Sequence, residues 1–148
     1  MVEIKDLYDA IATKLHSLTG YPCYYDYVRQ NAEYPCFSIR LISSEQTPDL
    51  DRRYLREHLF EILCFPSESG EVKDINAEVY AWAPKLFLAL EYIKVNTGEL
   101  LRGTDTSYKV VDGVLQFLVS YDFFILKKRD PEAKMQTLKT NGGIADGN

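Results

Sequence analysis

A two-residue Asp112-Gly113 step between segments of alternating polarity is the feature that most constrains how this chain can fold. Both residues accept positive φ, so the pair favours a type I′ turn, which joins two antiparallel strands directly. Apolar residues occupy every second position over residues 115–123, which is the period of a strand. A partner strand is predicted over residues 107–111. The chain must therefore build an antiparallel hairpin, and with it a sheet.

Two stretches carry the period of an amphipathic helix. In residues 3–19, apolar side chains recur at spacings of three and four, and Gly20 is a natural residue to end that helix. Residues 71–93 repeat the pattern around an interior Pro84. A proline there removes the hydrogen bond to the carbonyl of Tyr80, which predicts a kink. Both apolar stripes need a surface to cover, so we predict that the two helices pack on the sheet.

Three further segments are predicted as strands, namely residues 23–28, 36–42 and 52–65. The polar residues 43–51, which include Pro48, are predicted as a loop, and residues 66–70 as a turn. The long strand over residues 52–65 is charged in its first half and apolar on both faces in its second. Strands covered on both sides read this way. We therefore expect a sheet whose central part is sandwiched, with one strand projecting beyond the core.

The fold class predicted is α+β, a mostly antiparallel β-sheet with two main amphipathic helices packed on it. A length of 148 residues with 46% hydrophobic side chains suits one domain, predicted over residues 1–129. From residue 130 onward glycines become frequent and apolar anchors sparse. Residues 130–148 are therefore predicted to be a flexible C-terminal tail.

Nothing in the sequence has the spacing of a catalytic, cofactor-binding or metal site. The three cysteines are odd in number and form no CxxC pair, which argues against a disulfide framework or a zinc site. His58 and Cys64 share a predicted strand face, but six residues of strand separate them by roughly 20 Å. No phosphate-binding or nucleophile-elbow motif occurs. We predict that the protein is not an enzyme, needs no cofactor and keeps its thiols as structural groups.

Charge and hydropathy exclude further classes. The formal net charge is −5, and no cluster of Lys and Arg suits a grip on nucleic-acid phosphates. No stretch approaches the roughly 20 apolar residues of a membrane span. The N-terminus has acidic residues where a signal peptide would be basic. We expect a cytosolic protein that binds neither membranes nor a specific nucleic-acid sequence.

The charged half of the long strand is the one place where positive charge concentrates. Alternation would put Arg52, Arg56 and His58 on one face, and Arg53 with Glu57 on the other. Two interpretations stay open, namely an edge strand protected by charge against aggregation, or an arm that contacts another protein. A single arginine beside a glycine at residues 101–104 indicates either a weak anion nest or a turn with an exposed side chain. The candidate interface residues are Asp49, Arg52, Arg53, Tyr54, Arg56, His58 and Arg102.

The order and spacing of four segments resemble a known family. They are PCFSIRLI at 35–42, RRYLREHLFEILCFP at 52–66, LEYI at 90–93 and LLRGTDTSYKVVDGVLQFLVSYDFFI at 100–125. Together they resemble the small tail-terminator (tail completion) proteins of long-tailed bacteriophages and prophages, over most of residues 3–126. These motifs are structural rather than catalytic.

The resemblance implies a structural protein that forms a ring, typically a hexamer, on the phage tail tube. Such a ring ends tube polymerisation and offers a surface to the head-neck or stopper proteins, while DNA only passes through it. The implied partners are other copies of the chain, the tail-tube protein and a neck protein. The implied location is the bacterial cytoplasm during assembly and then the neck end of the virion tail. The alternatives are another neck subunit or, from a different class, a small-molecule-binding domain or enzyme with a cleft between sheet and helices.

Overall fold

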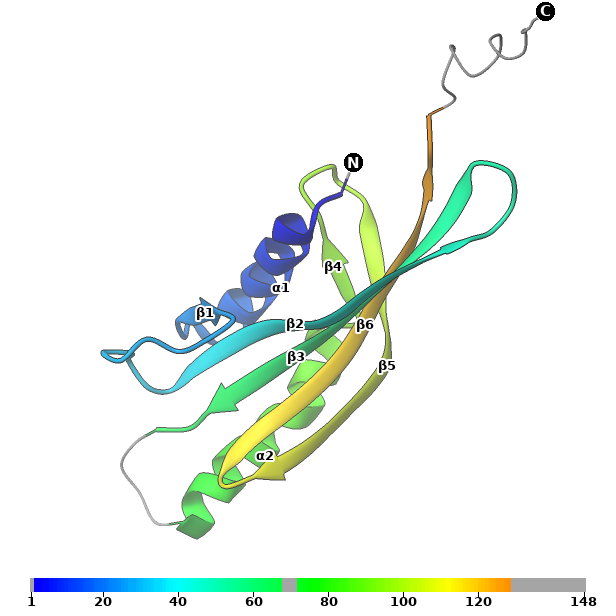
Figure 1. Ribbon diagram of the computed structural model, residues 1–148. Coiled ribbons are helices and arrows are strands. Elements are labelled where there is room, and N and C mark those ends of the chain that lie inside the picture. The colour runs from blue at the N-terminus through cyan, green and yellow to red at the C-terminus, as the bar shows by residue number, and fades with distance from the viewer. Residues whose placement is uncertain (1, 68–71, 129–148) are drawn as a thin grey trace, which may run out of the picture. The chain divides into compact units, whose positions relative to one another are not determined.

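The computed structural model describes residues 2–67 and 72–128, with the backbone alone for 72–76 (Figure 1). The predicted tail over residues 130–148 lies outside the described residues, as does most of the predicted turn over 66–70. The elements run in the order α1 (Ile4–Thr19), β1 (Cys23–Tyr25), β2 (Cys36–Pro48), β3 (Arg53–Phe65), α2 (Val72–Ala89), β4 (Tyr92–Lys94), β5 (Leu100–Val111) and β6 (Val114–Leu126).

The chain divides into two compact units. Unit 1 comprises Met1–Gln46 and Arg56–Phe123. Unit 2 comprises Thr47–Leu55 and Phe124–Asn148, and of that second segment the structure describes residues 124–128. Strands β2, β3 and β6 contribute residues to both units. The expectation of one domain over residues 1–129 stays a prediction.

The six strands of the described sheet lie in the order β1-β2-β3-β6-β5-β4. Strand β5 pairs antiparallel with both β4 and β6, whereas the short β1 pairs parallel with β2. At the β5–β6 turn, Asp112 has φ 52° and Gly113 has φ 77°, as the predicted type I′ hairpin requires. The predicted α+β class, a mostly antiparallel sheet with two helices, is confirmed.

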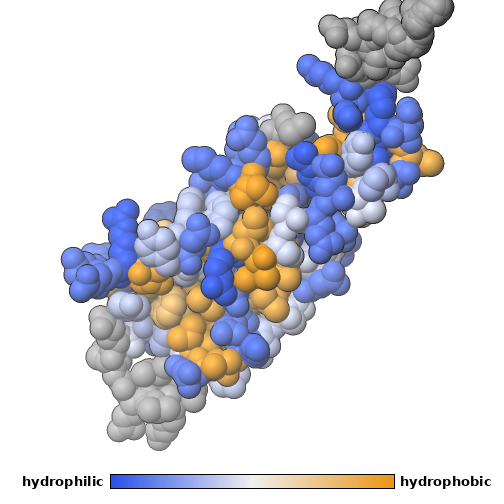
Figure 2. Space-filling model, viewed as in Figure 1, coloured by the Kyte–Doolittle hydropathy of each residue, from blue (hydrophilic) through white to orange (hydrophobic). Residues whose placement is uncertain are grey.

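The core of unit 1 lies between the two helices and one face of the sheet (Figure 1). On β3, alternate side chains are buried on this face, and Leu59 and Leu63 on the other face are half-buried. Figure 2 shows hydrophobic residues gathered along the sheet face turned to the viewer, among hydrophilic ones. The expected sandwiching of the central sheet is therefore wrong, because both described helices pack on the same face. The apolar residues on the other face are shielded only in part.

Two segments adopt a strand where the sequence predicts something else. Residues 43–48 were expected in a loop but continue β2, so the connection to β3 shrinks to a turn around Asp51, whose φ is 52°. Residues 92 and 93 were expected at the end of the second helix but form β4 with residue 94, and Ile93 pairs with Leu101. In both cases a neighbouring strand satisfies the backbone, and such a partner is invisible to local periodicity.

The end of α2 is held by β5 and β6. The Tyr121 hydroxyl, fully buried, donates a hydrogen bond of 2.6 Å to the carbonyl of Leu90. A Cβ on Gly103 would come within 2.6 Å of the same carbonyl oxygen and 2.8 Å of a Val119 methyl carbon. Only glycine lets β5 approach the helix end this closely. Pro84 lies inside α2 as expected, and the kink stays a prediction.

Helix α1 starts and stops where the sequence predicts. Asp6 accepts a hydrogen bond from the Glu3 amide to complete a capping box, and Gly20 closes the other end with φ 78°. A second polar set ties the helix to the sheet, because the Tyr8 hydroxyl donates to Asp26 (2.5 Å) and accepts from the Leu41 amide (2.9 Å). The helix is therefore fixed against β1 and β2 by directed bonds as well as by apolar packing.

Candidate functional site

The candidate arginines at the β2–β3 connection belong to unit 2. We use "hairpin tip" for its described residues, 47–55 and 124–128. The turn is closed by two backbone hydrogen bonds, from the Asp49 amide to the Arg53 carbonyl (2.9 Å) and from the Arg53 amide to the Leu50 carbonyl (2.8 Å). The Lys127 amide donates to the Arg52 carbonyl (2.8 Å), which extends the pairing of this strand to the end of β6.

Arg53 contacts other residues of the hairpin tip. Both its Nε and its Nη2 lie 2.5 Å from Asp49 Oδ2, and its guanidinium stands over the Phe124 ring, 4.7 Å from the centroid. The Arg53 and Asp49 side chains are 44% and 35% exposed, so water screens the pair and its net contribution to stability is small. An exposed pair of this kind exchanges partners at little cost.

Arg52 is held more tightly than its sequence position suggests. Its Nη1 donates to the Lys127 carbonyl (3.1 Å), and its Nε lies 3.7 Å from Asp51 Oδ2. That Nε is buried and has no hydrogen-bond partner among the described residues. A buried donor without a hydrogen bond is costly, and the nearby Asp51 carboxylate compensates part of that cost.

Exposed apolar side chains accompany these arginines, and sequence reasoning missed them. Leu50 is 70% exposed, Leu126 59% and Phe124 55%. Leu50 and Leu126 join the two arginines in lining a pocket of about 260 Å³. The available signals in the sequence were a lone leucine in a polar turn and the apolar run FFIL at residues 123–126, which continues beyond the buried part of the strand. Arginine beside exposed aromatic and aliphatic groups is typical of a protein interface.

The charge of the hairpin tip opposes that of the whole chain. Four basic side chains stand against the two acidic ones, Asp49 and Asp51, which leaves a net charge of +2 where the full chain has −5. The basic residues are Arg52, Arg53, Lys127 and Lys128. The tip therefore presents a basic surface on an acidic chain, which complements acidic groups.

The remaining candidates are Tyr54, half-buried in unit 2, and three residues of unit 1. Arg56 donates from Nε to Gln46 (2.8 Å) on the neighbouring strand. Arg102 is exposed and lies over the Tyr92 ring, 3.8 Å from Glu91. Its segment is strand β5 rather than the expected turn or anion nest, because Arg102 pairs with Tyr92 of β4.

His58 differs from the other candidates because its side chain is in the core. It is 2% exposed, stacks on Phe123 with ring centroids 5.1 Å apart, and has Nδ1 3.0 Å from the Tyr121 carbonyl oxygen. Burial lowers the pKa of His58 below its ordinary value, since the charged imidazolium is poorly solvated there. In this conformation His58 can support the strand but cannot reach a partner.

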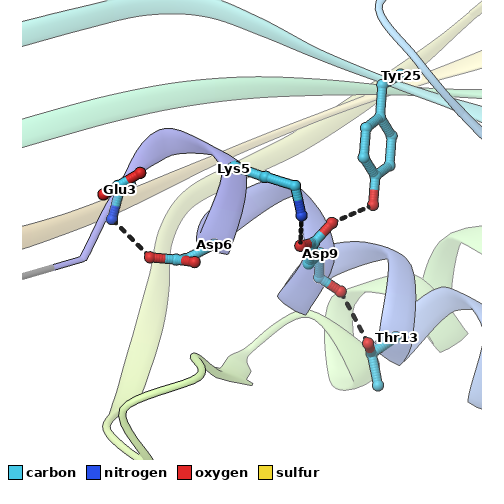
Figure 3. A network of polar contacts seen from close by, with 6 residues as sticks. All are labelled: Glu3, Lys5, Asp6, Asp9, Thr13 and Tyr25. Carbon is cyan, nitrogen blue, oxygen red and sulfur yellow. Dashed lines mark hydrogen bonds and ion pairs between the residues drawn. The ribbon is translucent and has the colours of Figure 1, made fainter.

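A groove of about 470 Å³ between α1 and β1 is the place where a small molecule would be sought. Asp9, the carboxylate in its lining, accepts hydrogen bonds from Lys5 (2.7 Å) and Tyr25 (2.6 Å), as Figure 3 shows. The bond from Lys5 lowers the pKa of Asp9, which therefore stays a carboxylate and is unsuited to act as an acid. His16 and Ser17 also line the groove.

The thiols are poorly suited to nucleophilic chemistry. Burial raises the pKa of Cys23 and of Cys36 to about 11, and it also raises the pKa of Cys64. Across residues 2–67 and 72–128, no group of three His, Cys, Asp or Glu side chains could hold a metal ion. The described helices include none that is long and apolar enough to cross a membrane.

Comparison with known proteins supplies the family. No curated protein matches the sequence. One solved structure aligns with 88% of this chain and 99% of its own, at 14% identity and a TM-score of 0.34, which is too low to carry an argument. The family model described as phage tail terminator protein matches residues 6–133, which include α2, all six strands and all but the first two residues of α1. The chain therefore belongs to the phage tail terminator family and is a structural protein of the phage tail.

Proposed function

We propose that the protein caps the phage tail tube as a ring of identical subunits, ends tube polymerisation and presents a surface to the head-neck proteins. Family membership supports the tail role. The observation that supports assembly through a specific surface is the hairpin tip, where exposed apolar and basic side chains lie together. In this proposal the tip contacts either the next subunit of the ring or the end of the tube.

Two properties of the hairpin tip favour a contact role over simple protection of a strand edge. Leu50, Phe124 and Leu126 expose apolar surface, which protection by charge would not require. Arg53 is bound through an exposed pair that a partner's carboxylate could replace.

The first test changes Leu50→Asp in a phage that depends on this gene, with Leu88→Asp as the matched control. Leu50 and Leu88 are 70% and 77% exposed, so neither change should alter the free energy of unfolding by more than about 0.5 kcal/mol. Leu88 lies on α2 in unit 1, away from the tip in sequence. We expect Leu50→Asp to give overlong or headless tails by electron microscopy, and Leu88→Asp to give normal ones.

A charge swap separates an internal role of Arg53 from a contact role. Arg53→Asp alone breaks the pair with Asp49, and Arg53→Asp with Asp49→Arg restores it in reverse. If Arg53 contacts a partner, the swapped protein should fold normally by circular dichroism and still fail to cap tubes. Normal tails from both Leu50→Asp and the swapped protein would reject the role of the hairpin tip.

A further inference from the structure

Strand β1 lies at one edge of the described sheet, and its outer side is open. The Phe37 amide donates to the Pro22 carbonyl (2.9 Å), and the Asp26 amide donates to the Ile39 carbonyl (2.7 Å). Residues 22 and 26 therefore direct their backbone groups toward β2. Because these directions alternate along a strand, Cys23 and Tyr25 direct their amides away from the sheet.

The open edge is short and clearly bounded. The Tyr25 carbonyl is taken by the Tyr27 amide (2.9 Å) across Asp26, whose φ is 71°. The Cys23 amide, the Cys23 carbonyl and the Tyr25 amide are left directed outward. None of the three residues of β1 is charged or a proline, and these are the residue types that commonly protect a sheet edge.

Two grooves flank this edge, and Tyr24, whose side chain alternates with those of Cys23 and Tyr25, lines only the second. The α-side groove is the 470 Å³ space already described, and it is lined by the small side chains Ala12, Thr13 and Ser17 and by His16 of α1, together with Cys23 and Tyr25. The tyrosine groove, about 300 Å³, is lined in addition by Tyr24, Tyr27 and Arg29. Alternate side chains of an added strand would enter the two grooves in turn.

Charge indicates what each groove would accept. Arg29 is exposed, and its guanidinium has no ion pair or hydrogen bond with any residue in the described ranges. In the α-side groove, by contrast, Asp9 is already bound to Lys5 and Tyr25. An acidic side chain therefore suits the tyrosine groove, and a small apolar one suits the α-side groove.

We propose that the edge of β1 binds an extended segment of another protein by strand addition. The segment hydrogen-bonds to the backbone of Cys23 and Tyr25, places apolar side chains in the α-side groove, and sets a carboxylate beside Arg29. This site lies in unit 1 and involves no residue of the hairpin tip, so it stands or falls independently of ring assembly.

The test uses the full chain labelled with ¹⁵N and a capped peptide of alternating valine and glutamate. We expect the amide resonances of Cys23 and Tyr25 to shift saturably and their hydrogen exchange to slow. The same peptide with lysine in place of glutamate should bind more weakly. In the Arg29→Glu variant the lysine peptide should instead bind more tightly than the glutamate peptide, by up to about fivefold in Kd, which is the scale of one exposed ion pair. Ser17→Trp fills the α-side groove and should abolish binding, whereas Lys14→Trp on the same helix should not.

Three results would overturn the proposal. One is the absence of saturable shifts at Cys23 and Tyr25. Another is equal binding of a peptide whose backbone amides are N-methylated, because strand addition needs those donors. The third is slow exchange of the two amides in the free protein that disappears on dilution, since the edge would then be an interface between copies of this chain.

Discussion

Removing the hydroxyl of Tyr121 tests the contact that determines where α2 ends. This hydroxyl is fully buried and donates to the Leu90 carbonyl at 2.6 Å, one residue beyond the helix. Burial raises the pKa of Tyr121 above its ordinary value, so the group is a neutral donor at neutral pH. Tyr121→Phe keeps the ring and its edge contact with Phe60 and deletes only the donor.

The expected cost follows from what remains behind. The net contribution of a hydrogen bond is about 1 kcal/mol, but removing one partner so that a buried carbonyl is left without its donor costs about 1–3 kcal/mol in all. Gly103 crowds this carbonyl from the side of β5, since a Cβ on that residue would lie 2.6 Å from the carbonyl oxygen. We therefore expect Tyr121→Phe to lower the free energy of unfolding by about 1–3 kcal/mol.

Urea denaturation of the isolated subunit measures this loss, with Tyr108→Phe as the matched control. Tyr108 is 39% exposed, and its hydroxyl has no hydrogen-bond partner in the parts of the chain that the structure describes. The control should change stability by less than about 0.5 kcal/mol. Equal midpoints for the two variants would refute the reasoning, because removing the donor of the Leu90 carbonyl would then not lower stability.

Two further outcomes are expected. Changing Leu86, which is fully buried on α2, to Ala should lower the free energy of unfolding by about 2–5 kcal/mol, measured as a shift of the denaturation midpoint. An unchanged midpoint would contradict the packing of α2 on the sheet. His58 has a lowered pKa, so the unfolded chain binds its proton more readily, and stability should fall as pH drops through the ordinary histidine value of about 6.5 toward the lower folded value. Replacing His58 with Phe should flatten the dependence of Tm on pH over that window, and an unchanged slope would assign the effect to other groups.

The sequence by itself determined those elements whose signals are local. The Asp112-Gly113 turn needs only two residues that accept positive φ, and both adopt it. Helix α1 ends at Gly20 because the left-handed cap is a property of that residue. The burial of alternate residues on β3 and β6 likewise follows from a period of two.

Tertiary structure decided the elements that depend on a distant partner. Residues 43–48 and 92–94 are strands because neighbouring strands satisfy their backbones, which outweighs the polarity of the first segment and the helical spacing of the second. The same holds for the candidate site. Alternation predicted a face for His58 but not the Phe123 ring and Tyr121 carbonyl that enclose it.

The hairpin tip shows the same division between local and distant information. The cluster of arginines was readable in the sequence, whereas Leu50, Phe124 and Leu126 became candidates only when their exposure was known. Phe124 and Leu126 are out of phase with the apolar positions of residues 115–123 and share a face with Gln116, Ser120 and Asp122, and residues 47–55 and 124–128 are brought into one unit only by folding. Local sequence sets φ, caps and periodicity, because these depend on near neighbours. Exposure and partnership depend on what the rest of the chain leaves uncovered, and only the folded structure decides that.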